Sequence, residues 1–210
     1  DTEEIEDLYS IPDFDPEAGH PTRFAEIEEM ILERSRQQPV FFKDMAYYVA
    51  DVMPEKAALL HHMTHCFLIR DPAESILSYH QRDPDFSQIE VGIEAQFILY
   101  QILVSVGITP LIVTADELRA APQATLRRYW EFAGLPYVED AFEWDNRVPE
   151  GWQSVKGWHG QVLNSGAIQK TVAGRDYAAE LAGLGAPFVA YDRHHRPYYD
   201  ALKDIAAHQK

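Results

Sequence analysis

Short apolar runs alternate with longer amphipathic stretches along this chain. Residues 66–69 and 110–113 are two such runs, each too short for a surface helix and free of charged side chains. Runs of this kind are typical of buried strands in a parallel sheet. Residues 40–42 are a further candidate for a buried strand. Because helical patterns separate the three runs, the sequence predicts an α/β fold built on a parallel sheet.

The segments between these runs carry helical periodicity. Residues 87–106 hold the longest apolar stripe, with Ser87 as its N-cap and Gly107 as its stop. Residues 1–15 are acidic and show no period, and residues 137–172 are loop-rich. Further helices are expected at residues 21–36, 46–60 with a break near Pro54, 72–81, 122–133 and 190–207, the last interrupted by Pro197.

The residues that follow the first of the two runs begin a helix. Asp71 can cap it, and Pro72 suits its first position. Glu74 completes a spacing that resembles a capping box. Arg70 then lies at the carboxyl end of a strand, where open α/β sheets bind their ligands.

A phosphate-binding role for this junction follows from the chemistry of two side chains. The planar guanidinium of Arg70 suits a phosphate, and Ser78 can add a hydroxyl from the helix. The alternative is an ordinary strand-to-helix turn with a surface arginine. The local pattern leaves both interpretations open.

Composition and charge narrow the class of protein. A chain of 210 residues with 46% hydrophobic residues is most simply one soluble domain. The net charge of −16 argues against nucleic acids and sulfated polysaccharides as partners. If the protein acts on a substrate, this charge favours a small one that is neutral or cationic. No apolar run approaches the length of a membrane span. A single cysteine, Cys66, excludes an internal disulfide, fits the cytoplasm and is expected to be a buried, inert thiol, and no Cys/His spacing suggests a metal site.

Four segments together resemble sulfotransferases that use PAPS (3′-phosphoadenosine 5′-phosphosulfate). The sequence Arg70-Asp-Pro, with Ser78 eight residues after the arginine, is similar to the segment that binds the 3′-phosphate in that family. Residues 114–136, which read TADELRAAP, ATLRR and EFAGLP, resemble a second stretch of the family. Residues 40–44 (VFFKD) resemble the strand whose lysine assists sulfuryl transfer, and residues 156–160 (KGWHG) resemble a loop at the 3′-phosphate.

The resemblance covers roughly residues 26–165 and carries expectations about the fold. It implies a three-layer, mostly parallel sheet flanked by helices, of the P-loop nucleotide-binding type. Such a fold begins with a strand and a glycine-rich loop that binds the 5′-phosphosulfate. Residues 1–39 show no such strand–loop–helix. We therefore expect a single sulfotransferase-like domain over residues 1–210 that lacks this unit, which would lie upstream in the natural chain; a degenerate relative that no longer binds the full cofactor is the alternative.

The resemblance also assigns roles to individual residues. Arg70 and Ser78 would bind the 3′-phosphate of PAPS or its product PAP (3′-phosphoadenosine 5′-phosphate), while Lys156 and Gly157 would close over it. Lys43 would stabilise the leaving phosphate or the sulfuryl oxygens. An equally weighted alternative is a strand-end lysine paired with its neighbouring aspartate. The acceptor would be a small hydroxylated molecule.

The proton acceptor is the least defined part of the site. The family often places a histidine where this chain has Met45, so another histidine is needed. His80, near the ligand edge of its predicted helix, is the preferred candidate for this base. Each histidine is individually more typical of a surface or packed residue. Other candidates are His20, His61, His62, His65 and His159.

Two departures from the family pattern keep other functions open. Ala115 stands where the family often has tyrosine, and Val155 stands where an arginine usually precedes the Lys-Gly pair. The alternatives are another P-loop small-molecule transferase or kinase, for which no Walker-type loop is present, and a non-catalytic nucleotide-binding protein. Trp144, Trp152 and Trp158 could line an acceptor pocket or pack as a folded lid. Association into a homodimer is left open.

Overall fold

The computed structural model describes residues 21, 23–144, 165–169 and 175–209. The chain divides into two compact units, one of residues 1–44 and 145–166, the other of residues 45–144 and 167–210. Each unit is described by itself. The expectation of a single domain stays a prediction.

The first unit contains helix α1 (Phe24–Ser35), which confirms the helix expected at residues 21–36. The strand expected at residues 40–42 is wrong, because these residues form no regular structure. Phe41 is 79% exposed and Phe42 46% exposed. An apolar run of three residues becomes a strand only where a neighbouring strand satisfies its backbone groups, and none of the described strands pairs with this segment.

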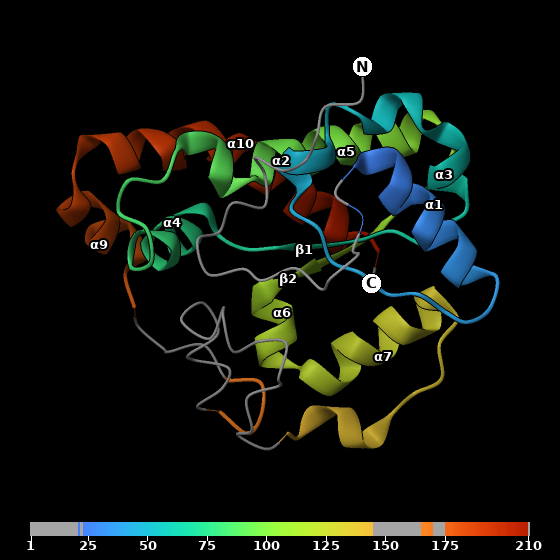
Figure 1. The fold of residues 1–210 in the computed structure, drawn as a ribbon. Coiled ribbons are helices and arrows are strands. Elements are labelled where there is room, and N and C mark those ends of the chain that lie inside the picture. Colours follow the sequence, from blue (N-terminus) through green and yellow to red (C-terminus); the bar gives the residue numbers. More distant parts are fainter. Residues whose placement is uncertain (1–20, 22, 145–164, 170–174, 210) are drawn as a thin grey trace. The chain divides into compact units, whose positions relative to one another are not determined.

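The second unit holds a pair of parallel strands. These are β1 (Cys66–Ile69) and β2 (Leu111–Thr114), with Cys66 opposite Leu111 and the register kept to the last residue of each. The strand expected at residues 66–69 is confirmed at both ends, and the other lies one residue later than expected. A crossover of helices joins the two strands, so the α/β class with a parallel sheet is confirmed for this unit (Figure 1).

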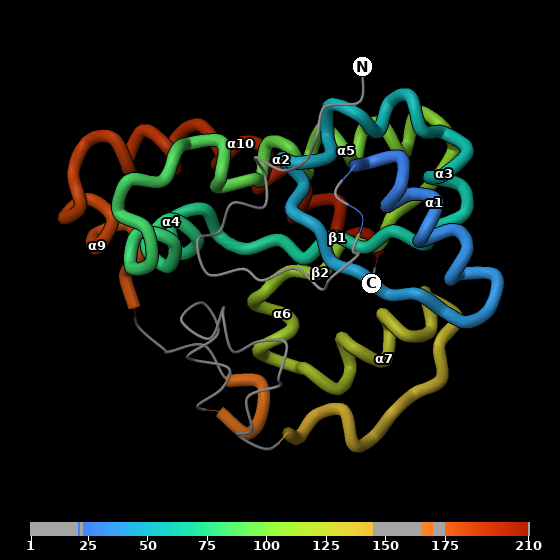
Figure 2. Tube along the Cα trace, in the orientation of Figure 1, coloured from blue at the N-terminus to red at the C-terminus, as the bar shows by residue number. Residues whose placement is uncertain are grey.

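The helices of this unit surround the strand pair. In Figure 1, α5 and α10 lie on one side of the strands and α6 and α7 on the other. The path of the chain in Figure 2 brings α4, α9 and α10 together beyond the end of β1. None of the described helices is long and apolar enough to cross a membrane. Their bounds are α2 Ala46–Val49, α3 Ala57–His61, α4 Pro72–His80, α5 Ile93–Ser105, α6 Ala115–Ala120, α7 Pro122–Ala133, α9 Tyr177–Leu184 and α10 Ala186–Ala207, with 3₁₀ helices η2 Met53–Glu55, η3 Gln88–Val91 and η4 Glu139–Phe142.

Glycine divides the long helix expected at residues 87–106. Gly92 has a φ of 76° and separates η3 from α5, since this left-handed conformation ends one helix and redirects the chain into the next. Ser87 caps η3 through its hydroxyl and backbone N–H, both of which donate to Glu90. Pro197, by contrast, does not interrupt α10. It only removes the N–H that the fourth preceding carbonyl would have accepted.

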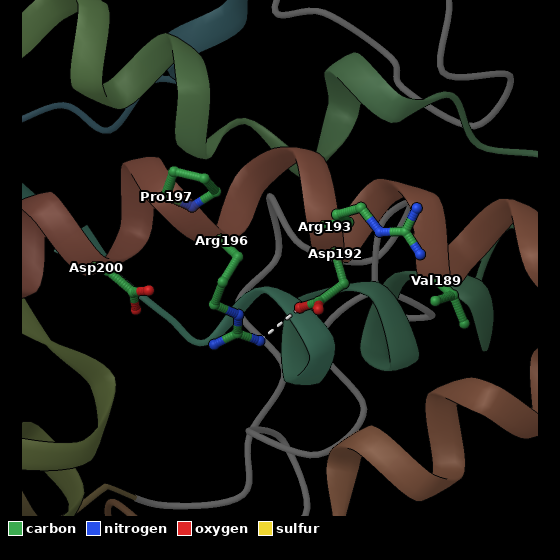
Figure 3. A pocket seen from close by; sticks show the side chains of 6 residues that line it. All are labelled: Val189, Asp192, Arg193, Arg196, Pro197 and Asp200. Carbon is green, nitrogen blue, oxygen red and sulfur yellow. Dashed lines mark hydrogen bonds and ion pairs between the residues drawn. The ribbon is translucent and has the colours of Figure 1, made fainter.

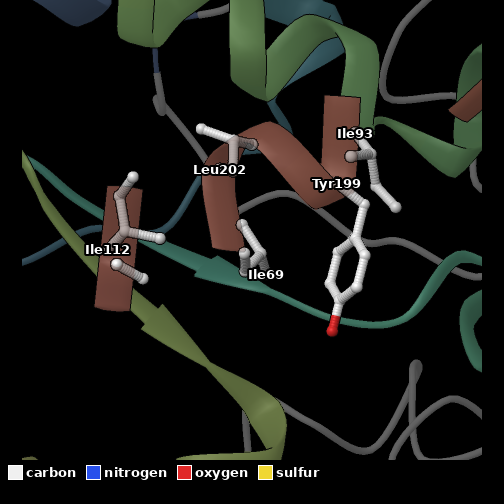
Figure 4. Packing of buried hydrophobic residues seen from close by; sticks show 6 residues of the cluster. Ile69, Ile93, Ile112, Tyr199 and Leu202 are labelled. Carbon is white, nitrogen blue, oxygen red and sulfur yellow. The ribbon is translucent and has the colours of Figure 1, made fainter. Parts of the chain in front are cut away.

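The main core lies between β1, β2, α5 and α10. Isoleucines from both strands pack against one face of α10 (Figure 4), so the position of α10 fixes where β1 ends. The fully buried members of this cluster are Ile69, Ile93, Ile112, Tyr199, Leu202 and Ala206.

The edge of β2 and one face of β1 have different surroundings. The side chain of Gln209 binds the edge of β2: its Oε1 accepts a hydrogen bond from the Ile112 N–H at 2.9 Å, and its Nε2 donates one to the Pro110 carbonyl at 2.9 Å. Cys66 and Leu68 are exposed on β1, so the expectation of a fully buried strand and a buried thiol is wrong for them. They alternate with inward-facing neighbours and therefore project from the other face of the strand.

His195 on α10 makes the stability of this unit depend on pH. It is 1% exposed, its Nε2 donates to the Gln88 carbonyl at 2.8 Å, and its Nδ1 accepts the Glu94 N–H at 3.3 Å. Burial lowers the pKa of His195 below its ordinary 6.5. Below pH 6.5, His195 is therefore protonated in the unfolded chain but stays neutral in the folded chain. The free energy of unfolding should then fall by up to about 1.4 kcal/mol for each unit by which the pH is lowered.

Urea unfolding between pH 7.5 and 5.5 measures this dependence. His195→Gln should reduce the slope, while His62→Gln, at an exposed position of the same unit, should leave it unchanged. Burial also lowers the pKa of His65, so part of the slope should remain in His195→Gln. Equal slopes in all three proteins would contradict the assignment.

Candidate functional site

The start of α4 is built as the sequence predicts. Pro72 is its first residue, and Asp71 Oδ1 accepts the N–H groups of Ala73 at 2.9 Å and Glu74 at 3.4 Å. Asp71 also binds Arg196 on α10, at 2.6 and 3.1 Å. Burial alone would raise the pKa of Asp71, but Arg196 and the helix N–H groups hold it below its ordinary value. The turn after β1 is therefore fixed from both sides.

Glu74 is the centre of an ion-pair cluster that the sequence did not predict. Its side chain is buried, and its two oxygens accept hydrogen bonds from both terminal nitrogens of Arg119 at 2.6 and 2.7 Å. It also accepts Arg70 Nη2 at 2.8 Å and the Tyr177 hydroxyl at 3.1 Å. Burial alone would raise the pKa of Glu74, but the two arginines lower it to about 2. Glu74 thus binds arginines, where the sequence suggested a capping box.

Arg70 lies directly after β1, at the carboxyl end of the strand, as expected. Its side chain is 40% exposed, and only Nη2 contacts Glu74. Its Nε is buried and has no hydrogen-bond partner among the described residues. Both guanidinium groups share this one carboxylate, and Asp116, 60% exposed and 3.7 Å from Arg119, is screened by solvent, so part of the positive charge of the arginines stays unbalanced beside this unused donor. An anion is the ligand that such a group lacks.

Ser78 lies on α4 one helical turn after Glu74, on the same face, and is partly buried. The structure thus places Arg70, Glu74 and Ser78 in succession along one side of α4. That Arg70 and Ser78 bind one phosphate together stays a prediction. Glu74 lies between them as the ion-pair partner of Arg70, a role that the sequence does not predict.

His80 lies at the other end of α4, about 13 Å along the helix axis from its cap at a rise of 1.5 Å per residue. Its ring packs edge-on against Phe188, with 4.8 Å between centroids. This surrounding is that of a packed histidine. The structure does not bring His80 to Arg70, so its role as a base stays a prediction.

For two further groups of predicted residues, a place beside this cluster stays a prediction. Lys43 belongs to the first compact unit, and its place relative to Arg70 stays a prediction. Lys156 and Gly157 lie outside the described residues, as do His20, Trp152, Val155, Trp158 and His159.

Two shallow cavities, of about 470 and 640 Å³, lie along α10, and the larger one reaches the cluster at Tyr177. Both are lined by Asp192 and Arg196, and the larger one also by Asp71 and Tyr177. Figure 3 shows Arg196 in the smaller cavity with its guanidinium bound to Asp192. Two aspartates face two arginines in the smaller cavity, and three aspartates face two arginines in the larger one. Neither lining therefore carries an excess of positive charge that would attract an anion.

Comparison with known proteins gives one match over most of the chain. A family model described as a sulfotransferase domain matches residues 17–204. Two curated proteins of Arabidopsis thaliana, named branched-chain-amino-acid aminotransferase-like proteins 2 and 1, are 30% identical over 96 residues and 28% identical over 102 residues. The matches cover 45% and 48% of this chain but only 17% and 18% of those relatives, so the chain spans less than a fifth of their length. No solved structure matches significantly.

Proposed function

Since this chain belongs to the sulfotransferase domain family, we propose that it transfers a sulfuryl group from PAPS to a hydroxyl group of a small acceptor. Arg70 and Ser78 bind the 3′-phosphate of the nucleotide. Lys156 and Gly157 close over that phosphate. The protein acts in the cytoplasm, and its fold is the three-layer P-loop type.

The observation that carries the proposal is the unused donor of Arg70. A buried Nε without a partner costs free energy unless a ligand accepts its hydrogen bond. A 3′-phosphate supplies such an acceptor and also pairs with the positive charge of Arg70, which the shared Glu74 carboxylate balances only in part. Ser78, one helical turn beyond Glu74 on α4, would add a hydroxyl to the same phosphate.

The proposed chemistry needs few groups beyond those that position the reactants. When bound, PAPS supplies the sulfuryl group, whose bond to the 5′-phosphate breaks as the acceptor oxygen bonds to sulfur. Lys43 places a positive charge where negative charge develops on the phosphate oxygens. A base takes the hydroxyl proton of the acceptor; His80 is the sequence-based choice, and its packing against Phe188 does not support that role.

Nucleotide titration of the full natural polypeptide tests the proposal. PAP should bind more tightly than adenosine 5′-phosphate, ADP or ATP. Arg70→Gln should weaken PAP binding by about ten- to a hundredfold, because the phosphate loses a charge-assisted partner while Glu74 keeps a neutral donor. Adenosine 5′-phosphate, which has no 3′-phosphate, should bind both proteins alike.

Arg82→Gln is the matched control, since it removes an exposed arginine just beyond the other end of α4. It should leave PAP affinity unchanged. PAP binding that survives in Arg70→Gln would overturn the site. Tight, Arg70-dependent PAP binding without sulfation of any hydroxylated acceptor would instead identify a non-catalytic nucleotide-binding protein, and preference for ATP would favour a kinase.

A further inference from the structure

We propose that Glu74, held by Arg119 and Tyr177, is a positioning residue that fixes the guanidinium of Arg70 for recognition of the 3′-phosphate. The inference rests on the proposed function and goes beyond it, because Glu74, Arg119 and Tyr177 do not touch the nucleotide in this scheme. They determine the affinity and selectivity of the site through Arg70.

The first step of the argument is that Glu74 is rigid. It lies within α4 with 4% of its surface exposed, and the bidentate contact with Arg119 fixes the plane of its carboxylate. The Tyr177 hydroxyl adds a third bond at 3.1 Å. The carboxylate is therefore held from α4, α6 and α9 at once, which leaves it no other rotamer with the same partners.

The second step is that Arg70 needs such a support. Its side chain is 40% exposed, so packing alone does not restrict its several rotatable bonds. The bond from Nη2 to Glu74 at 2.8 Å selects one arrangement and leaves Nε free. A guanidinium that is already ordered loses less conformational entropy when it binds an anion.

The third step concerns charge. A carboxylate beside an anion site would repel a phosphate and cancel the charge of Arg70. The second guanidinium, from Arg119, offsets this because it shares the carboxylate through two short bonds. Its other partner, Asp116, lies farther away at 3.7 Å and is 60% exposed, so it takes up little of the Arg119 charge. Glu74 can then orient Arg70 without neutralising the site. This explains why two arginines from different elements converge on one glutamate.

Conservative variants of the two supports test the inference, since Glu74 itself is tied to stability. Tyr177→Phe removes only the hydroxyl that binds Glu74, and Arg119→Lys keeps the charge but loses the fork. Each should weaken PAP binding three- to tenfold and leave the affinity for adenosine 5′-phosphate unchanged. Tyr198→Phe is the matched control, because it removes a tyrosine-to-glutamate bond of 2.9 Å to Glu94 in the same unit and should change neither affinity.

The ratio of the two affinities separates positioning from a purely structural role. A structural role would lower both affinities together, or lower the melting temperature with the ratio unchanged, and either result would overturn the inference. The unsubstituted protein could bind PAP selectively and through Arg70 while the ratio stays unchanged in Tyr177→Phe and Arg119→Lys. That result would contradict the positioning role of Glu74 but leave the proposed function standing. Absence of PAP selectivity in the unsubstituted protein would overturn the proposed function, and the inference with it.

Discussion

Replacing Glu74 with glutamine should lower the free energy of unfolding by about 3 kcal/mol or more. Glutamine keeps one acceptor oxygen but turns an amide N–H₂ toward donors, so Arg119 loses half of its fork. Removing one partner of a buried ion pair leaves the other charge uncompensated, and such changes cost about 3–5 kcal/mol. The lower end applies here, because the Arg119 side chain is 18% exposed and the Arg70 side chain 40%.

Urea unfolding at pH 7 measures this loss, with Glu180→Gln as the matched control. Glu180 also accepts a bidentate arginine, Arg175, at 2.8 and 2.7 Å, but both side chains of that pair lie in solvent. Exposed pairs contribute little, so the control should match the unsubstituted protein within error. Similar losses in both variants would contradict the central role of Glu74.

The pKa of Glu74 predicts how this contribution responds to acid. Its folded value, about 2, lies below the ordinary 4.5, so the unfolded chain takes up the proton first as pH falls. The stabilisation is present in full above pH 4.5 and is lost progressively between pH 4.5 and 2. Glu74→Gln should therefore show a smaller acid-induced loss than the unsubstituted protein over this window.

Local sequence signals predicted the strand-to-helix junction well. The short apolar run ending at Ile69, the cap at Asp71 and the proline at the first helical position each act within a few residues. Their energetics depend on backbone hydrogen bonds at the junction itself. The structure therefore keeps this segment as the sequence predicts it, with Arg70 at the strand end.

The strand prediction for residues 40–42 was wrong because a strand depends on a partner that is distant in the sequence. An apolar run specifies a strand only together with a neighbour, and the sequence does not say which strands pair. The exposure of Leu68 on β1 has the same origin, since the run 66–69 does not reveal which face the helices cover. Pairing and coverage are properties of the tertiary fold.

In the candidate site, too, contacts between residues close in the sequence could be predicted, whereas contacts between distant residues could not. The spacing of Arg70 and Glu74 by four residues could have indicated an ion pair on one side of α4. Arg119 and Tyr177 follow Glu74 by 45 and 103 residues, so only the tertiary fold, which packs α9 on α4 and places Arg119 of α6 within reach, brings them to it. No spacing rule identifies such partners. Arg119 was noted within a family-like segment, but not as a ligand of Glu74.

Leu202→Ala should lower the free energy of unfolding by about 3 kcal/mol. Leu202 is fully buried on α10, in the cluster that contains Ile69 and Ile112 from the two strands. Truncating a buried leucine removes its transfer free energy and leaves a cavity, at a cost of about 2–5 kcal/mol. Urea unfolding measures the loss. Leu135→Ala is the control, because Leu135 is 38% exposed in the same unit and should lose less than about 1 kcal/mol.

The same variant separates stability from recognition. Leu202 belongs to the same buried cluster as Ile69, the residue before Arg70, whereas the guanidinium is held by a hydrogen bond to Glu74. Folded Leu202→Ala protein should therefore keep the unsubstituted preference for PAP over adenosine 5′-phosphate despite its lower stability. Tyr177→Phe should do the reverse, losing preference with little loss of stability. If Leu202→Ala also lost the preference, loosening of the core would be enough to disorder Arg70, and the Glu74 cluster would not be the element that positions it.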